Sequence, residues 1–154
     1  MNVRNRFGLS MLVVAAFAFA NAAWADDKKD HDKHSAHFEQ CAKACADCMR
    51  ECDLCARHCA DLVAAGQKEH LRTLGACLDC SSFCTSAAKI TARRGPMAGL
   101  ICEACAKACD ECGAACEKFP DDAMMAKCAK ECRNCAKACR EMLKHIGHEA
   151  HQKQ

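Results

Sequence analysis

Eighteen cysteines recur along this chain of 154 residues, mostly at alternating intervals of three and four positions. In the segment CAKACADCMRECDLCARHC, which runs from Cys41 to Cys59, the successive intervals are 4, 3, 4, 3 and 4. Such an alternation is normally the apolar stripe of an α-helix that packs against other helices. Here thiols occupy the stripe that leucine usually fills. The pattern therefore predicts a helical bundle whose interior is lined with soft sulfur ligands.

Glycine and proline residues divide the chain after residue 34 into four predicted helices. These helices cover approximately residues 35–65, 68–92, 96–118 and 122–145. Pro96 is expected as the first residue of the third helix and Asp122 as the N-cap of the fourth. Short connections make neighbouring helices antiparallel. The predicted fold class is all-α, an antiparallel up-down-up-down four-helix bundle with a cysteine-lined core over residues 35–146.

The first 25 residues have the pattern of a secretory signal peptide. Arg4 and Arg6 form a basic region, an apolar run follows from residue 7 to 20, and Ala23-Trp24-Ala25 provides an A-x-A cleavage site. An uncleaved N-terminal anchor is the alternative. Asn5 separates the two arginines, which favours general secretion over twin-arginine export. We expect cleavage after residue 25, export to the bacterial periplasm, and mobile polar tails at residues 26–34 and 147–154.

The composition after residue 25 argues against several functions and raises a question about the core. This part has 20 basic and 20 acidic side chains and few aromatic ones, so nucleic-acid binding is not expected, nor is membrane association once the signal peptide is removed. Leu, Ile, Val and Phe make up only 14 of its 129 residues. This share, about 11%, lies below the roughly 20% typical of a folded chain. Either cysteine and alanine form the core, or a bound ligand completes it and stabilises the folded state.

Disulfide and redox chemistry are the main rivals to metal binding. Helix neighbours three or four residues apart have Cβ atoms about 5–6 Å apart, whereas a disulfide needs about 3.5–4.5 Å. Thioredoxin-like chemistry requires a βαβ context, and no segment of this sequence is typical of a strand. The compact C-x₂-C-x₂-C spacing of ferredoxins is also absent. A thiol-redox or electron-transfer protein using cysteine or cluster chemistry is kept as the alternative function.

The charge of a buried site favours monovalent copper over zinc. Four thiolates around Zn²⁺ leave two negative charges at every site, and uncompensated buried charge is costly. One Cu⁺ that replaces one thiol proton changes no net charge, so a row of thiols can take up many ions. Cysteine and methionine ligands also select Cu(I). We therefore expect multiple Cu(I) ions per chain.

The cysteine stripes resemble those of the exported four-helix-bundle copper storage protein family, over residues 35–146. This resemblance implies a homotetramer that stores Cu(I), buffers it and supplies it to copper enzymes, with no catalytic site. It also implies metal binding by all eighteen cysteines. These are Cys41, Cys45, Cys48, Cys52, Cys55, Cys59, Cys77, Cys80, Cys84, Cys102, Cys105, Cys109, Cys112, Cys116, Cys128, Cys132, Cys135 and Cys139.

The stripes continue past the last thiols to weaker copper ligands at both ends of the bundle. His34 and Met142 are predicted to form one mouth, because the start of the first helix and the end of the fourth lie at the same end. His70 and Met125 mark a second candidate mouth at the opposite end. Core packing is the alternative role for the two methionines. The donor and recipient of the copper are not indicated.

Two further expectations concern the rest of the bundle. The second helix has only three cysteines, so most of the metal is expected between the other three helices. Charged residues on the outer positions are expected to form a solvated face. Examples are Arg50, Glu51, Lys130 and Glu131.

Overall fold

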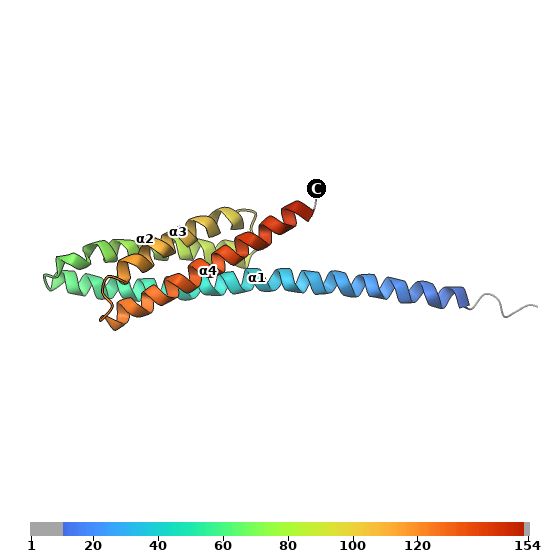
Figure 1. The fold of residues 1–154 in the computed structure, drawn as a ribbon, viewed down its shortest axis with the longest axis horizontal. Coiled ribbons are helices and arrows are strands. Elements are labelled where there is room, and N and C mark those ends of the chain that lie inside the picture. The colour runs from blue at the N-terminus through green and yellow to red at the C-terminus, as the bar shows by residue number, and fades with distance from the viewer. Residues whose placement is uncertain (1–10, 153–154) are drawn as a thin grey trace, which may run out of the picture. The chain divides into compact units, whose positions relative to one another are not determined.

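The structure is a computed structural model that describes the backbone of residues 11–152 and the side chains of residues 35–146. Every regular element within residues 11–152 is helical. These elements are α1 (Met11–Ala64), the 3₁₀ helix η1 (Lys68–His70), α2 (Leu71–Ala92), α3 (Ala98–Cys116) and α4 (Ala123–Gln152) (Figure 1). The chain divides into two units, residues 1–36 and 37–154, and the second contains the bundle. The predicted all-α class is confirmed.

Sulfur contacts establish the directions of the helices within the bundle. As the residue number rises along α1, the number of the contacted cysteine rises on α3 and falls on α4. Helix α1 therefore runs parallel to α3 and antiparallel to α4. The pairs are Cys41–Cys102 and Cys55–Cys116 for α1 with α3, and Cys45–Cys139 and Cys52–Cys128 for α1 with α4. Contacts of α2 with α3 also descend. The up-down-up-down arrangement therefore holds for the thiol-bearing part of the chain.

Several helix boundaries differ from the sequence expectation. α1 begins at Met11 instead of near Ser35, because residues 11–34 contain no glycine or proline to stop it. α4 continues to Gln152, since a single interior glycine such as Gly147 costs a helix only about 1 kcal/mol. Cleavage after residue 25 stays a prediction. No helix in the described part of the chain combines the length and apolarity needed to cross a membrane.

The ends of α1 and α2 share one termination motif. Gly66 has φ = +94°, and the amide of Gln67 donates to the carbonyl of Leu62 at 3.0 Å. After α2 the same left-handed position is occupied by Arg94, with φ = +53°, and the amide of Gly95 donates to the carbonyl of Ile90. Both are Schellman motifs, in which the left-handed residue is usually glycine. Arg94 therefore adopts a conformation that a side chain disfavours.

The starts of α3 and α4 differ in how well the sequence predicted them. Asp122 accepts hydrogen bonds from the amides of Met124 and Met125 at 2.9 and 3.0 Å, which confirms it as the N-cap of α4. Pro96, expected as the first residue of the third helix, lies two positions before α3, which starts at Ala98. A turn over residues 94–97 takes up the difference.

The bundle interior consists of cysteine, alanine and methionine. All eighteen cysteines are at most 1% exposed, and Met125 and Met142 are buried with them. None of the seven leucines in residues 35–146 is buried; Leu100 is 69% exposed. Buried alanines, including Ala106 and Ala136, let the helices approach closely. Cysteine, alanine and methionine side chains therefore fill the interior of the described bundle.

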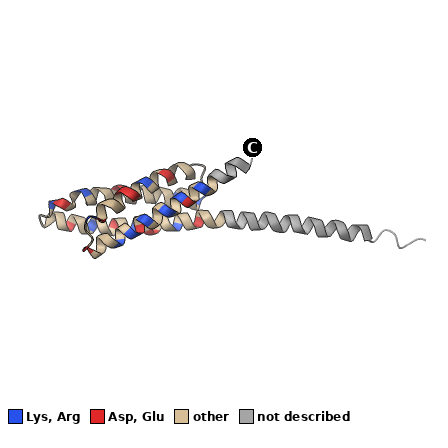
Figure 2. Cartoon of the chain, in the orientation of Figure 1, with Lys and Arg blue, Asp and Glu red and all other residues tan. Residues whose placement is uncertain are grey.

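Lys, Arg, Asp and Glu positions are distributed along all four helices of the bundle (Figure 2), and several polar contacts outside the core join neighbouring helices. Ser81 of α2 donates a hydrogen bond to Asp53 of α1 at 2.5 Å. The guanidinium of Arg133 on α4 pairs with Glu117, the residue that follows α3, at 2.7 Å. Glu51, expected on the solvated face, is instead 3% exposed, and its carboxylate lies 2.9 Å from the Lys127 ammonium. Expecting full solvation for Glu51 was wrong because it faces the seam between α1 and α4.

Replacing Arg94 by glycine is expected to stabilise the reduced, metal-free protein by about 0.5–1 kcal/mol. Glycine removes the steric cost of positive φ, although it loses more chain entropy on folding. Arg93, whose φ is −95°, provides the matched control, and Arg93→Gly should not stabilise. Thermal unfolding followed by circular dichroism measures both variants. A melting temperature for Arg94→Gly at or below that of Arg93→Gly would contradict the strain assigned to Arg94.

Candidate metal centre

Four helices direct their thiols to one shared interior. α1 contributes six cysteines, α2 three, α3 five and α4 four, and each lies on the inward face that the 3/4 spacing defines. All eighteen are free thiols in the structure. The closest sulfur atoms on different helices lie 3.7–4.0 Å apart, far longer than the roughly 2.05 Å of a disulfide bond.

These sulfur distances match the geometry of thiolate-bound metal ions. A metal–sulfur bond of about 2.3 Å gives sulfur–sulfur edges of about 3.8 Å in a tetrahedron and about 4.0 Å in a triangle. Among the described residues, several groups of cysteines have all their sulfur atoms within 4.8 Å of one another, and five of these groups contain four cysteines from different parts of the chain. They are Cys45/105/135/139, Cys48/80/84/109, Cys48/52/80/132, Cys52/112/128/132 and Cys55/77/116/128. The folded chain therefore holds thiols at coordination distance before any metal is present.

The four-thiol groups form one continuous row. Several cysteines belong to two groups, for example Cys48 and Cys128. From Cys41 the contacts pass to Cys139 at 4.0 Å and on to Cys45 at 3.7 Å. Further steps of 3.7–4.0 Å lead through Cys135, Cys84, Cys109, Cys48, Cys52, Cys112, Cys77, Cys116 and Cys55. An ion bound at one end can thus exchange between neighbouring sulfurs along the bundle.

Burial by itself raises the pKa of a thiol in this core, because it penalises the charged thiolate. Desolvation raises the pKa of Cys59 to about 12, and the nearby Cys55 adds to this effect. Where sulfurs share hydrogen bonds the pKa values separate: the S–H groups of Cys102 and Cys41 lower the pKa of Cys139, whereas the pKa of Cys102 is raised. A few thiols in such a row therefore ionise first, and a bound cation must displace protons from the rest.

The structure places three of the four predicted mouth residues at the two ends of the bundle. Met142 is 1% exposed and lines a cavity of about 270 Å³ that also contacts Cys41. At the opposite end Met125 is fully buried and His70 is 5% exposed. Both methionines fill space in the core, consistent with the packing alternative. The side chain of His34 lies outside the described residues.

His70 stands out among the end residues because it has an unsatisfied polar atom. Its Nδ1 is buried without a hydrogen-bond partner, and its ring centroid lies 4.2 Å from that of Phe119. A buried, unpaired imidazole nitrogen is costly and retains its capacity to bind a cation. A cavity of about 320 Å³ adjoins it. His70 is therefore the end residue whose chemistry best suits metal binding.

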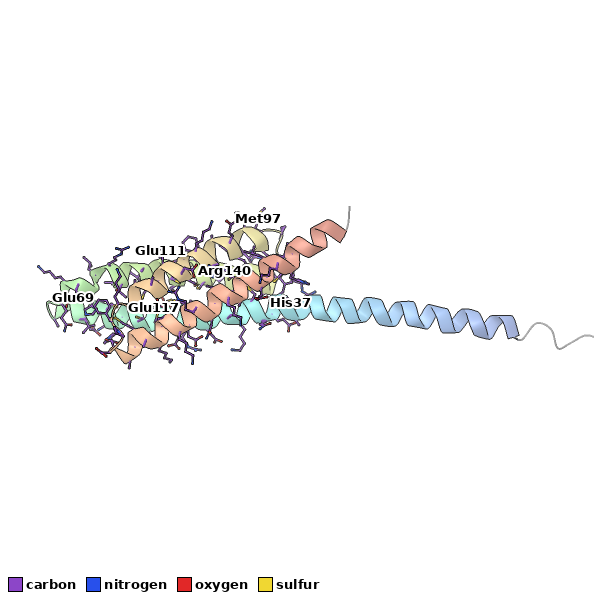
Figure 3. The ribbon with its side chains drawn as sticks, in the orientation of Figure 1. His37, Glu69, Met97, Glu111, Glu117 and Arg140 are labelled. Carbon is purple, nitrogen blue, oxygen red and sulfur yellow. The ribbon has the colours of Figure 1, made fainter. Side chains whose placement is uncertain are left out.

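Two polar pairs near the ends were not predicted from the sequence. His58 Nε2 lies 2.6 Å from the carboxylate of Asp122, tying α1 to the start of α4. Burial raises the pKa of Asp122, but hydrogen bonds from His58 and from the α4 amides outweigh this and hold it below its usual value. At the other end the rings of His37 and His145 are 4.3 Å apart (His37 is labelled in Figure 3). Both pairs join α1 to α4 or to its N-cap. The predicted antiparallel arrangement of these two helices already places the partners at the same end, so it could have indicated both pairs.

A four-helix bundle with an interior of thiols at coordination distance defines a class of protein suited to soft metal ions, and the comparisons agree. Residues 14–144 match the family described as "Copper storage protein". A curated relative, the "Uncharacterized cysteine-rich protein YhjQ" of Bacillus subtilis strain 168, is 35% identical over 98 residues. That match covers 61% of this chain and 84% of the relative.

Solved structures with the same fold carry related names. The apo form of copper storage protein 3 from Bacillus subtilis is 32% identical with a TM-score of 0.61, over 68% of this chain and 97% of that one. Ccsp from Streptomyces lividans, loaded with 10 copper equivalents, is 25% identical with a TM-score of 0.65, over 71% and 85%. The chain belongs to the copper storage protein family.

The raised pKa of Cys59 predicts that its contribution to stability depends on pH. Above about pH 9.0 an unfolded thiol loses its proton, while Cys59 in the metal-free bundle keeps its proton up to about pH 12. Unfolding then releases a proton, so stability is full below pH 9 and falls as the pH rises. Urea unfolding of reduced protein should therefore show a steeper decline from pH 8 to 10 in the wild type than in Cys59→Ala. Parallel declines would show that Cys59 titrates normally.

Proposed function

We propose that this chain is a Cu(I) storage protein that holds many ions in its thiol core. The observation that carries the proposal is the continuous row of buried sulfurs at 3.7–4.0 Å. A site for one structural ion would need only four ligands. Here the interior of the whole bundle is made of ligands, which is the arrangement that storage requires. The copper-loaded Streptomyces structure with the same fold supports this proposal.

All eighteen cysteines are proposed as Cu(I) ligands. Each ion that binds displaces one thiol proton, so the buried core keeps its net charge as it fills. Zinc does not share this property, because each Zn²⁺ held by four thiolates adds two negative charges to a water-free interior. Soft thiolates also favour Cu(I) over harder ions. Loading to roughly one ion per thiol is therefore possible without charge accumulation.

The ends of the bundle are proposed to exchange copper with the outside. His70 and Met125 are buried at one end, and Met142 lines a cavity together with Cys41 at the other. His34 joins the second group by its position in the cysteine register. Imidazole and thioether bind Cu(I) as neutral ligands, without the charge of a thiolate. Such ligands hold an ion briefly and pass it to the adjacent thiols.

The cellular role follows from this chemistry and from the start of the chain. The A-x-A site after an apolar run supports export to the periplasm with loss of residues 1–25. A store of this kind buffers Cu(I) against toxicity and supplies it to copper enzymes, so we propose binding and release as its activity instead of catalysis. We also propose that it assembles as a homotetramer, by its likeness to the family.

Titration of reduced apoprotein with Cu(I), in competition with a chromophoric chelator, tests storage directly. Uptake should approach one Cu(I) per thiol, with little change in helical circular dichroism because the thiols are already in place. The melting temperature should rise with loading, since copper binds the folded state. Saturation at one or two ions per chain would reject the storage function and favour the redox alternative.

Alanine variants of His34, His70 and Met142 test the proposed exchange sites. Each should slow loading, or removal by a chelator, because a transfer ligand is lost. Copper capacity should stay close to that of the wild type, since the thiols remain. Met49, a partly buried methionine on α1, serves as a control for loss of a thioether away from the ends. A large fall in capacity for any end variant would contradict the exchange role.

A further inference from the structure

A cavity of about 440 Å³ lies in the seam between α2 and α3, beside the first half of α2 and the second half of α3. Three small residues, Gly75, Ala76 and Ala108, create its space. A Cβ atom added to Gly75 would meet nothing within 4 Å, so the cavity has room for a larger side chain at this position. The seam between these helices is therefore incompletely filled on the side of the bundle, in the half that contains the His70 end.

The floor of this cavity belongs to the thiol row. Cys80 lines it, and its sulfur lies 3.7 Å from that of Cys109 and 3.9 Å from that of Cys84. Cys80 is also a member of two of the four-thiol groups. It is 0% exposed, so the cavity ends at the thiol layer without opening the core to bulk water.

Two carboxylates stand at the rim of the cavity. Asp79 of α2 and Glu111 of α3 are both exposed, and neither forms an ion pair with any residue whose side chain is described (Figure 3 labels Glu111). Arg72 is the single basic side chain of the lining. The rim therefore has a net negative charge, which raises the local concentration of a cation.

The ends of the bundle offer less direct routes to the thiols. At one end the cavity beside His70 and Phe119 has no cysteine in its lining. At the other, Phe38 and Met142 are 6% and 1% exposed and cover the last thiols, although the cavity there reaches Cys41. Among the cavities in the described part of the chain, the α2–α3 cavity reaches the thiol row at Cys80, away from the last thiols of the row.

We propose that this cavity is a lateral port, additional to the exchange sites at the ends, through which Cu(I), carried by a small thiol, reaches the core at Cys80. This proposal rests on the storage function above and adds its route. The copper–sulfur bond of the carrier breaks as a bond to the Cys80 sulfur forms, and the Cys80 proton passes to the departing thiolate. No electron is transferred. From Cys80 the ion moves to Cys84 or Cys109 and then in both directions along the row.

Filling the port without removing a thiol tests the route. Gly75→Leu places a bulky side chain in the cavity, and Gly99→Leu adds the same bulk where a Cβ is equally unhindered, outside the lining. The probe is Cu(I) carried by cysteamine, a small thiol whose ammonium group gives the complex a positive charge. Stopped-flow loading of Gly75→Leu should be about two- to threefold slower than wild type, since the sites at the ends stay open. Gly99→Leu should load at the wild-type rate, and both should reach full capacity. Wild-type loading kinetics in Gly75→Leu would overturn the port.

Pulse alkylation of the wild-type protein gives a readout that needs no variant and no copper. A brief exposure of reduced apoprotein to iodoacetamide, followed by peptide mapping, should modify Cys80 well before its neighbours Cys84 and Cys109. Equal or reversed modification would overturn the port. The two proposals fail differently: low copper capacity of the wild type rejects storage, whereas full capacity with no preference for Cys80 rejects only the lateral route.

Discussion

Contact between sulfur atoms in a water-free interior is the interaction on which this protein depends. Thiols pack as small hydrophobic groups, so the same side chains that bury the bundle core also line up as ligands. Their separations of 3.7–4.0 Å serve both purposes, because they correspond to packed sulfur atoms and to the edges of thiolate polyhedra. Folding therefore builds the metal site, and copper can bind without rearrangement of the helices.

A core of cysteine and alanine contributes less to the stability of the fold than a core of leucine, so contacts outside the core matter more. Cysteine and alanine bury less apolar area than leucine, and the leucines of the described bundle remain at least partly exposed. Contacts between helices compensate in part, such as the buried Glu51 with Lys127 and the bidentate pairing of Arg133 with Glu117. Each Cu(I) ion that replaces a thiol proton leaves the net charge of the core unchanged.

Much of the fold was predictable because its signals are local. The 3/4 spacing identified the inward face of every helix, and Gly66 and Asp122 marked helix ends through their own backbone and side-chain chemistry. The errors arose where a local signal was weak or overridden. Residues 11–34 lack a breaker, so α1 begins early, and Pro96 lies before the first residue of α3 instead of opening it. Glu51 is buried because its partner lies on another helix.

The sequence by itself determined which residues face the core, since helical periodicity depends only on spacing along one chain segment. It also determined the soft character of the site, because eighteen thiols permit little else. Only the tertiary structure decided which thiols meet, that His70 contacts Phe119 with an unpaired nitrogen, and that a cavity between α2 and α3 ends at Cys80. These features depend on the rotation and offset of four helices against one another, which the packing of all the side chains fixes together.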